Sequence, residues 1–187
     1  MQNEDVTLPA AILGVEDKQN LFIDEAGEWK ADYIPAYVRR YPFIFATGDD
    51  GKTLTVCLDE GFVGCNGDGQ GEPLFAEDGE QSPGLQRMVA FLAEYQNQYQ
   101  RTRAFCDRVR ELDLLEPMQA NVALNSGEQI SLAGFMVVNR AKLKELDAEK
   151  LKEMAQTDDL ELLYIHLFSM NKFPELVDRL AAKKADD

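Results

Sequence analysis

The stretch NGDGQGEPLFAE, which begins at Asn66, has the spacing of a calcium-binding loop. An EF-hand places oxygen ligands at positions 1, 3 and 5, glycine at position 6 and glutamate at position 12. These positions hold Asn66, Asp68, Gln70, Gly71 and Glu77. Two of the early ligands are neutral amides, and the preceding residues GFVGC lack a helical pattern. The sequence therefore favours a surface turn. Asp68 and Glu77 are its candidate metal ligands, but neither a metal nor another cofactor is expected.

His166 is the single histidine, so a nucleophilic triad or an imidazole base would have to use it. It lies in LELLYIHLFSM, a run that is apolar on nearly every side of a helix. This setting favours a packed histidine with one hydrogen-bond partner over a catalytic one. Cys57 and Cys65 provide no close ligand pair for a zinc site around it. An enzyme with His166 as acid or base remains the alternative.

Cations and aromatic residues gather in YIPAYVRRYPFIF, which begins at Tyr33. Arg39 and Arg40 are adjacent and are flanked by Tyr37 and Tyr41. Guanidinium groups stack on aromatic rings and bind carboxylates in a bidentate manner. Tyr37, Arg39, Arg40 and Tyr41 are therefore the candidate ligand-binding residues, for an acidic group or a peptide. The structural interpretation, which is favoured, is an internal clamp in which an arginine pairs with one of the many acids.

Composition restricts the class of protein. The 187 residues include 34 acids against 19 lysines and arginines, and the net charge of −15 disfavours nucleic acid and anionic membranes as partners. Three cysteines without a CxxC pair indicate a reducing compartment. Neither a membrane-spanning apolar run nor a signal peptide is visible. A cytoplasmic location is the default expectation, with signal-independent export to the cell surface left open. The oligomeric state is also left open.

Alternating apolar residues bounded by turn signals predict short strands. The segment TGDDGK joins two of them as a hairpin, so Tyr41, Phe43 and Phe45 are expected to pair with the following strand. Ser126-Gly127 separates a later pair. The predicted strands cover residues 21–25, 41–46, 53–60, 118–125 and 129–139.

The sequence changes to helical periodicity at Ser82-Pro83, where serine can cap and proline can begin a helix. One long amphipathic helix, with a single break left open, is predicted to follow and to end before Pro117. Further helical segments are predicted over residues 140–146, 147–156 and 158–170, with a last short helix from Pro174.

Asp158 and Glu161 have the spacing of a capping box, and residues 183–187 are expected to form a disordered tail. Because strands and helices are segregated rather than alternating, the predicted fold class is α+β.

Five segments resemble the bacterial SapC family: YIPAYVRRYPFIF, VCLDE, GEPLFAEDGEQSPGL, FMVVNRAKL and LLYIHLFSM. This family is named for a protein associated with surface-layer formation and is distinct from the peptide-transporter permease and the saposin of the same label. The resemblance extends from about Leu13 to Leu176, so residues 1–187 are expected to form a single SapC-like domain. Family members usually begin further upstream, so the N-terminus looks short.

The family pattern GExLFxxDGxxS also bears on the glycine-rich loop. It includes Leu74, Phe75, Asp78-Gly79 and Ser82 but not the early calcium-loop positions. By this resemblance Leu74 and Phe75 point into the core, Asp78-Gly79 forms a turn and Ser82 caps the helix.

The resemblance implies little about activity, since no catalytic residues are established for the family. Its members are often encoded beside halogenase-like and cupin-like proteins and outer-membrane receptors, which suggests an accessory role in nutrient uptake or peptide modification. The leading hypothesis is a non-enzymatic binding or accessory protein of the bacterial cell surface or a nutrient-uptake system, with a protein or peptide partner. The alternatives are an enzyme that uses His166 and a surface-layer structural protein.

Overall fold

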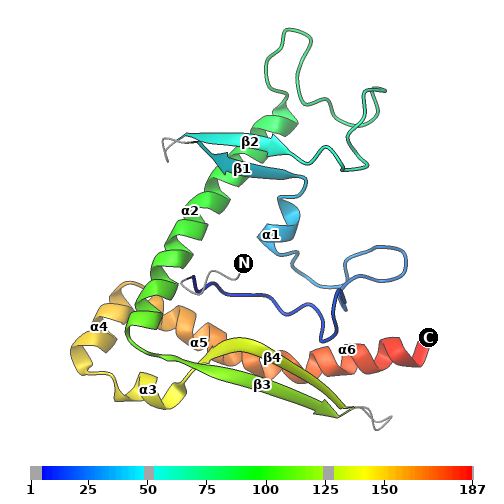
Figure 1. The fold of residues 1–187 in the computed structure, drawn as a ribbon. Coiled ribbons are helices and arrows are strands. Elements are labelled where there is room, and N and C mark those ends of the chain that lie inside the picture. Colours follow the sequence, from blue (N-terminus) through cyan, green and yellow to red (C-terminus); the bar gives the residue numbers. More distant parts are fainter. Residues whose placement is uncertain (1–5, 49–52, 124–128, 187) are drawn as a thin grey trace. The chain divides into compact units, whose positions relative to one another are not determined.

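The computed structural model describes residues 6–48, 53–123 and 129–186 (Figure 1). The chain divides into two compact units: unit 1 consists of residues 1–31 and 103–187, and unit 2 of residues 32–102. Two separate antiparallel strand pairs are combined with one long and several shorter helices, which confirms the α+β class. None of the described helices is both long and apolar enough to cross a membrane.

Unit 2 contains the short helix α1 (Ala36–Arg39) and a hairpin of β1 (Phe43–Thr47) and β2 (Leu54–Leu58). The register pairs Phe43 with Leu58 and Phe45 with Val56, so the expected pairing is confirmed for these two residues. It is wrong for Tyr41, because β1 begins only at Phe43. The TGDDGK connection falls largely outside the described residues.

Helix α2 (Pro83–Glu111) is unbroken and supplies residues to both units. Ser82 is buried, and its Oγ accepts a hydrogen bond of 3.2 Å from the backbone N–H of Leu85. Proline at the first helical position loses no needed donor. The predicted start of the helix and its end before Pro117 are confirmed.

Residues 74–82 form a miniature hairpin just before α2. Phe75 and Gln81 make an isolated bridge, and Gly79 adopts a φ of +85°, the left-handed conformation that favours glycine at such a turn. The Asp78-Gly79 turn and the Ser82 cap are thus confirmed. However, Leu74 and Phe75 are 37% and 57% exposed, so their expected place in the core is wrong. A single bridge provides no sheet face against which both side chains could be covered.

The same backbone pattern occurs in unit 1, where a full strand is predicted over residues 21–25. There Ile23 bridges Trp29, and Gly27 has a φ of +81°. In both hairpins the glycine N–H donates to the carbonyl three residues earlier, at 3.0 Å. The predicted strand is therefore only a one-residue bridge.

The other hairpin of unit 1 consists of β3 (Leu115–Ala123) and β4 (Gln129–Val138). The register shifts between Met118 and Ala120, and the Ser126-Gly127 connection lies outside the described residues. β4 lies beside α5 (Figure 1). The helices of this region are α3 (Arg140–Glu145), α4 (Ala148–Gln156), α5 (Asp159–Ser169), η1 (Met170–Lys172) and α6 (Phe173–Asp186).

Two of these helices have side-chain caps. Asn139 accepts from the N–H of Lys142, and Asp147 accepts from the N–H of Lys150. The predicted capping box at Asp158 is wrong: its φ is +63°, not the extended conformation of a capping residue, and its side chain makes no capping hydrogen bond. Helix α6 continues to Asp186, through most of the tail expected to be disordered.

Unit 1 contains two clusters of buried apolar side chains. One joins α6 to the N-terminal segment. The larger one joins the end of α2 to β4 and to helices α3, α4 and α5. Its buried members are Val109, Leu114, Val138, Leu143, Met154 and Leu163.

Candidate functional site

The candidate site in unit 2 is built around two arginines at the end of α1. The guanidinium carbon of Arg39 lies 5.1 Å from the ring centroids of both Tyr33 and Phe91. Its Nη2 also donates a hydrogen bond of 3.1 Å to the hydroxyl of Tyr33. Arg39 is therefore placed against one ring from the segment before α1 and one ring from α2.

Arg40 repeats this arrangement one step along the chain. Its guanidinium carbon lies 4.3 Å from the ring centroid of Tyr37 and 5.0 Å from that of Tyr95. Tyr33 lies before α1 and Tyr37 within it, whereas Phe91 and Tyr95 are one helical turn apart on α2, so each arginine meets one ring from each segment. We call these six residues the arginine–aromatic cluster.

The charge of this cluster is unbalanced within the described part of the chain. Neither Arg39 nor Arg40 forms an ion pair with any described carboxylate, although acids greatly outnumber bases in the sequence. Among the described residues, the contacts of both arginines are with aromatic rings, and the expected pairing with an acid stays a prediction. Each guanidinium carries five N–H donors, and the described hydrogen bonds use one of them, from Nη2 of Arg39 to Tyr33. Donors of the cluster are thus available to an anionic group.

Tyr41, the fourth candidate ligand-binding residue, makes different contacts from the other three. Its hydroxyl donates to Oδ2 of Asp59 at 3.1 Å, and its ring meets Phe62 edge-on at 5.4 Å between centroids. Desolvation and the Asp59 carboxylate raise the pKa of the Tyr41 phenol. The structure brings Tyr37, Arg39 and Arg40 together, while Tyr41 joins the segment after β2.

The described hydrogen bonds of Asn66, Asp68 and Gln70, which occupy calcium-loop positions, are made within the loop. The side-chain oxygen of Asn66 accepts from the N–H groups of Asp68 and Gln70, each at 3.2 Å. Glu77 lies in the turn of the miniature hairpin. Over residues 6–48, 53–123 and 129–186, no group of three or more histidine, cysteine, aspartate or glutamate side chains is placed to hold a metal ion.

His166 is half-buried on α5, where its Nε2 accepts a hydrogen bond of 3.1 Å from the backbone N–H of Val138 on β4. Because Nε2 accepts, the proton of the neutral ring is on Nδ1. Burial lowers the pKa of the imidazole below its usual 6.5. The contact joins α5 to the hairpin, and protonation of Nε2 would place two donors face to face.

The lowered pKa predicts a pH-dependent stability. A folded-state pKa below the unfolded value means that the stabilisation is complete above about pH 6.5 and is lost as the pH falls through the folded pKa. We expect the free energy of unfolding to decrease between pH 7 and pH 5. His166→Gln, whose amide oxygen can accept from the same N–H, should flatten this dependence. Urea titrations at several pH values measure the free energy of unfolding. If this free energy depends on pH as strongly in His166→Gln as in the unchanged protein, His166 is not the cause of the dependence.

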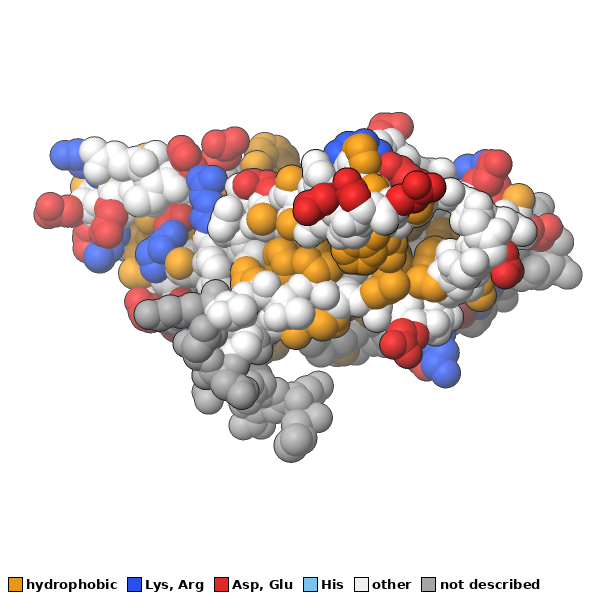
Figure 2. All heavy atoms as spheres, turned by 90° about the horizontal axis from the view of Figure 1, so that it is seen from above, with side chains coloured by type: hydrophobic (Ala, Val, Ile, Leu, Met, Phe, Trp, Pro, Cys, Tyr) orange, Lys and Arg blue, Asp and Glu red, His pale blue; other side chains and the backbone are white. Residues whose placement is uncertain are grey.

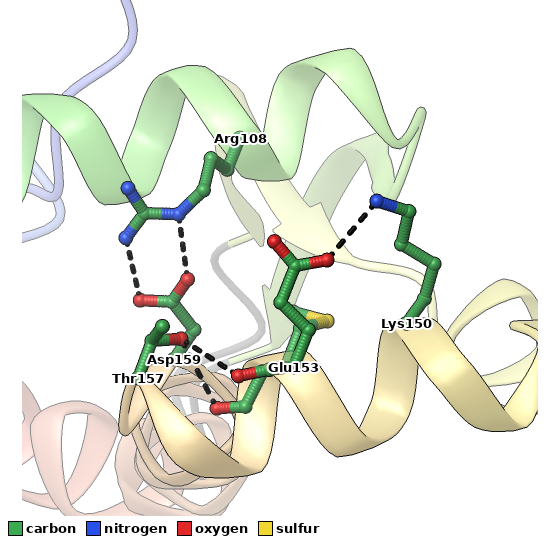
Figure 3. Close-up of polar contacts among 6 residues, drawn as sticks. Arg108, Lys150, Glu153, Thr157 and Asp159 are labelled. Atoms are coloured by element: carbon green, nitrogen blue, oxygen red, sulfur yellow. Dashed lines mark hydrogen bonds and ion pairs between the residues drawn. The ribbon is translucent and has the colours of Figure 1, made fainter.

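A second polar cluster occurs in unit 1, between α2 and the start of α5 (Figure 3). Arg108 donates from Nε and Nη2 to the two carboxylate oxygens of Asp159, at 2.7 and 2.8 Å. This fork-to-carboxylate geometry raises the pKa of Arg108. Lys150 and Glu153 pair beside it, around a cleft of about 170 Å³. Both oxygens of Asp159 are engaged, so the arrangement is a clamp and not a general base.

Sequence reasoning missed the partners that complete both clusters. Phe91 and Tyr95 are four residues apart within the predicted long helix, so their rings are expected on the same side of it. That spacing was the available signal. For Asp159, the adjacent Asp158 is the better capping candidate by sequence, and nothing in the local pattern points to Arg108.

A family model described as SapC matches residues 1–176. No curated protein and no solved structure matches the chain.

Proposed function

This chain belongs to the SapC family, and we propose that it is a non-enzymatic binding protein that recognises an anionic group through Arg39 and Arg40. The supporting observation is that the two guanidinium carbons lie 4.3 to 5.1 Å from four ring centroids, without a described carboxylate partner. In a chain of net charge −15, such a pair is a local reversal of the overall charge. The proposed role is that of an accessory protein in a cell-surface or nutrient-uptake system.

Stacking gives this site a defined geometry before a ligand arrives. A free arginine side chain loses rotamer freedom when it binds, and that entropy opposes association. Here the rings already restrict the guanidinium groups. A carboxylate can then receive parallel N–H donors at a smaller entropic cost.

The proposal predicts a specific response of these arginines to a simple carboxylate. On addition of acetate, the Nε–Hε NMR signals of Arg39 and Arg40 should shift saturably, while chloride at equal ionic strength leaves them in place. Arg39→Met or Arg40→Met should weaken the response about tenfold, because one charge-assisted pair of hydrogen bonds is lost.

Arg140→Met provides the matched control, since it removes one exposed positive charge from unit 1. The methionine side chain still packs on the rings, so each cluster variant should lose only about 0.5–1 kcal/mol of stability. Equal shifts at all arginine signals, or unchanged acetate binding in well-folded cluster variants, would refute anion recognition by this pair.

A further inference from the structure

An apolar pocket in unit 2 shares a wall with the arginine–aromatic cluster. It has a volume of about 470 Å³, within the range of small-molecule sites. Its apolar lining comes from β1, the loop before α2 and α2 itself: Phe43, Pro73, Leu74, Leu85, Met88 and Phe91. Figure 2 shows hydrophobic side chains that reach the surface, with acidic side chains beside them.

Phe91 belongs to both features. Its ring lines the pocket and also lies under the guanidinium of Arg39, at 5.1 Å. Met88, Phe91 and Tyr95 follow one another at three- and four-residue steps, so they lie along one face of α2. This face leads from the pocket wall to the ring beneath Arg40.

The charges on the pocket rim compensate one another. Arg87 Nη2 lies 3.3 Å from Oε2 of Glu72, and the Glu72 carboxylate packs against Gly84 so closely that a Cβ at this position would collide with it. The Arg87–Glu72 pair therefore contributes no net charge. By contrast, Arg39 and Arg40 have no described acidic partner, so the uncompensated charge next to the pocket is positive.

We infer that the ligand of this site is an amphipathic carboxylate, with its apolar body in the pocket and its carboxylate against Arg39. This inference rests on the proposed anion recognition and adds the ligand class. Apolar walls would favour a hydrocarbon body and disfavour a polyanion with polar groups throughout. Met88 provides a flexible wall that can adapt to different chains.

Octanoate, acetate and 1-octanol separate the two parts of the inference when each is titrated by NMR into the full chain. Burial of added methylene groups strengthens binding, so octanoate should bind at least about tenfold more tightly than acetate. It should also bind more tightly than 1-octanol, which has the same chain without the charge. Leu74→Glu should weaken octanoate binding at least about tenfold by placing a like charge at the wall. Phe75→Glu is the matched control, because the neighbouring Phe75 is exposed and does not line the pocket.

The outcomes distinguish this inference from the proposed function. Equal affinities for octanoate and acetate would overturn the pocket assignment and leave anion recognition intact. Octanoate and 1-octanol could also bind with equal affinity, and Arg39→Met could leave the octanoate affinity unchanged. These two results together would overturn anion recognition and, with it, this inference. Failure of acetate and octanoate to bind would refute both. If both variants fold, a larger loss of octanoate affinity in Leu74→Glu than in Phe75→Glu would support the pocket. Equal losses of affinity would refute it.

Discussion

Replacing Arg108 by methionine should lower the free energy of unfolding by about 3 kcal/mol. The Asp159 side chain is only 5% exposed, whereas that of Arg108 is 43% exposed. The variant therefore leaves a buried carboxylate without its two hydrogen bonds, and desolvation makes this state expensive. Asp159→Ala should cost less, because the remaining guanidinium can reach water.

Urea denaturation followed by circular dichroism measures this effect, and a double-mutant cycle tests its cause. Combining Arg108→Met with Asp159→Leu should recover most of the loss, since neither charge then remains buried. Glu153→Ala is the matched control in the same cleft (Figure 3). Its pair with Lys150 is exposed, so the change should be within about 0.5 kcal/mol. If the single and double variants lose equal stability, the buried-charge explanation is wrong.

Leu163→Ala should lower the free energy of unfolding by about 3 kcal/mol, within the range for large-to-small changes in a core. Leu163 is fully buried, and its cluster joins α5 to the end of α2, to β4 and to α3 and α4. Truncation removes apolar contacts and leaves a cavity among elements that are distant in sequence. Such a cavity is not easily filled by a local shift.

The adjacent Leu162 is the matched control for this change. It has the same residue type on the same helix but is 38% exposed. Leu162→Ala should therefore cost less than about 1 kcal/mol, because less apolar surface is transferred to water. Thermal melts of the two variants provide a direct comparison. Similar losses would mean that the exposed side of α5 is covered in the protein in solution.

The local elements of this protein could be predicted from its sequence. The start of α2 follows from Ser82 and Pro83. The Ser82 side chain accepts a hydrogen bond from a free backbone N–H at the helix start, and Pro83 has no backbone N–H that could remain unpaired. The β1–β2 register follows from alternation of apolar residues, because a one-residue shift would expose the wrong face. These signals act over a few residues and require no knowledge of distant contacts.

The wrong predictions concern residues whose burial or capping depends on contacts distant in sequence or on the backbone conformation. Leu74 and Phe75 have a core-like composition, but the isolated bridge at Phe75 leaves them partly exposed. Asp158 has the right spacing for a cap, yet its left-handed conformation prevents capping. At the candidate site, Arg39 and Arg40 could be selected from composition alone. Their actual neighbours, Phe91 and Tyr95, lie some fifty residues away. The spacing of these two rings places them on one side of a helix, but it does not say that this side meets the arginines.

The distribution of aromatic residues determines what optical spectroscopy can report about this protein. Trp29, the one tryptophan of the sequence, stacks on Phe22 in unit 1, with 5.9 Å between ring centroids. Five of the six tyrosines fall within residues 32–102. Tryptophan fluorescence therefore follows unit 1, while the near-ultraviolet tyrosine signal is dominated by unit 2. A transition recorded by one signal alone would describe one of the two units. Only coincidence of the two signals would justify treating the unfolding of the chain as a single step.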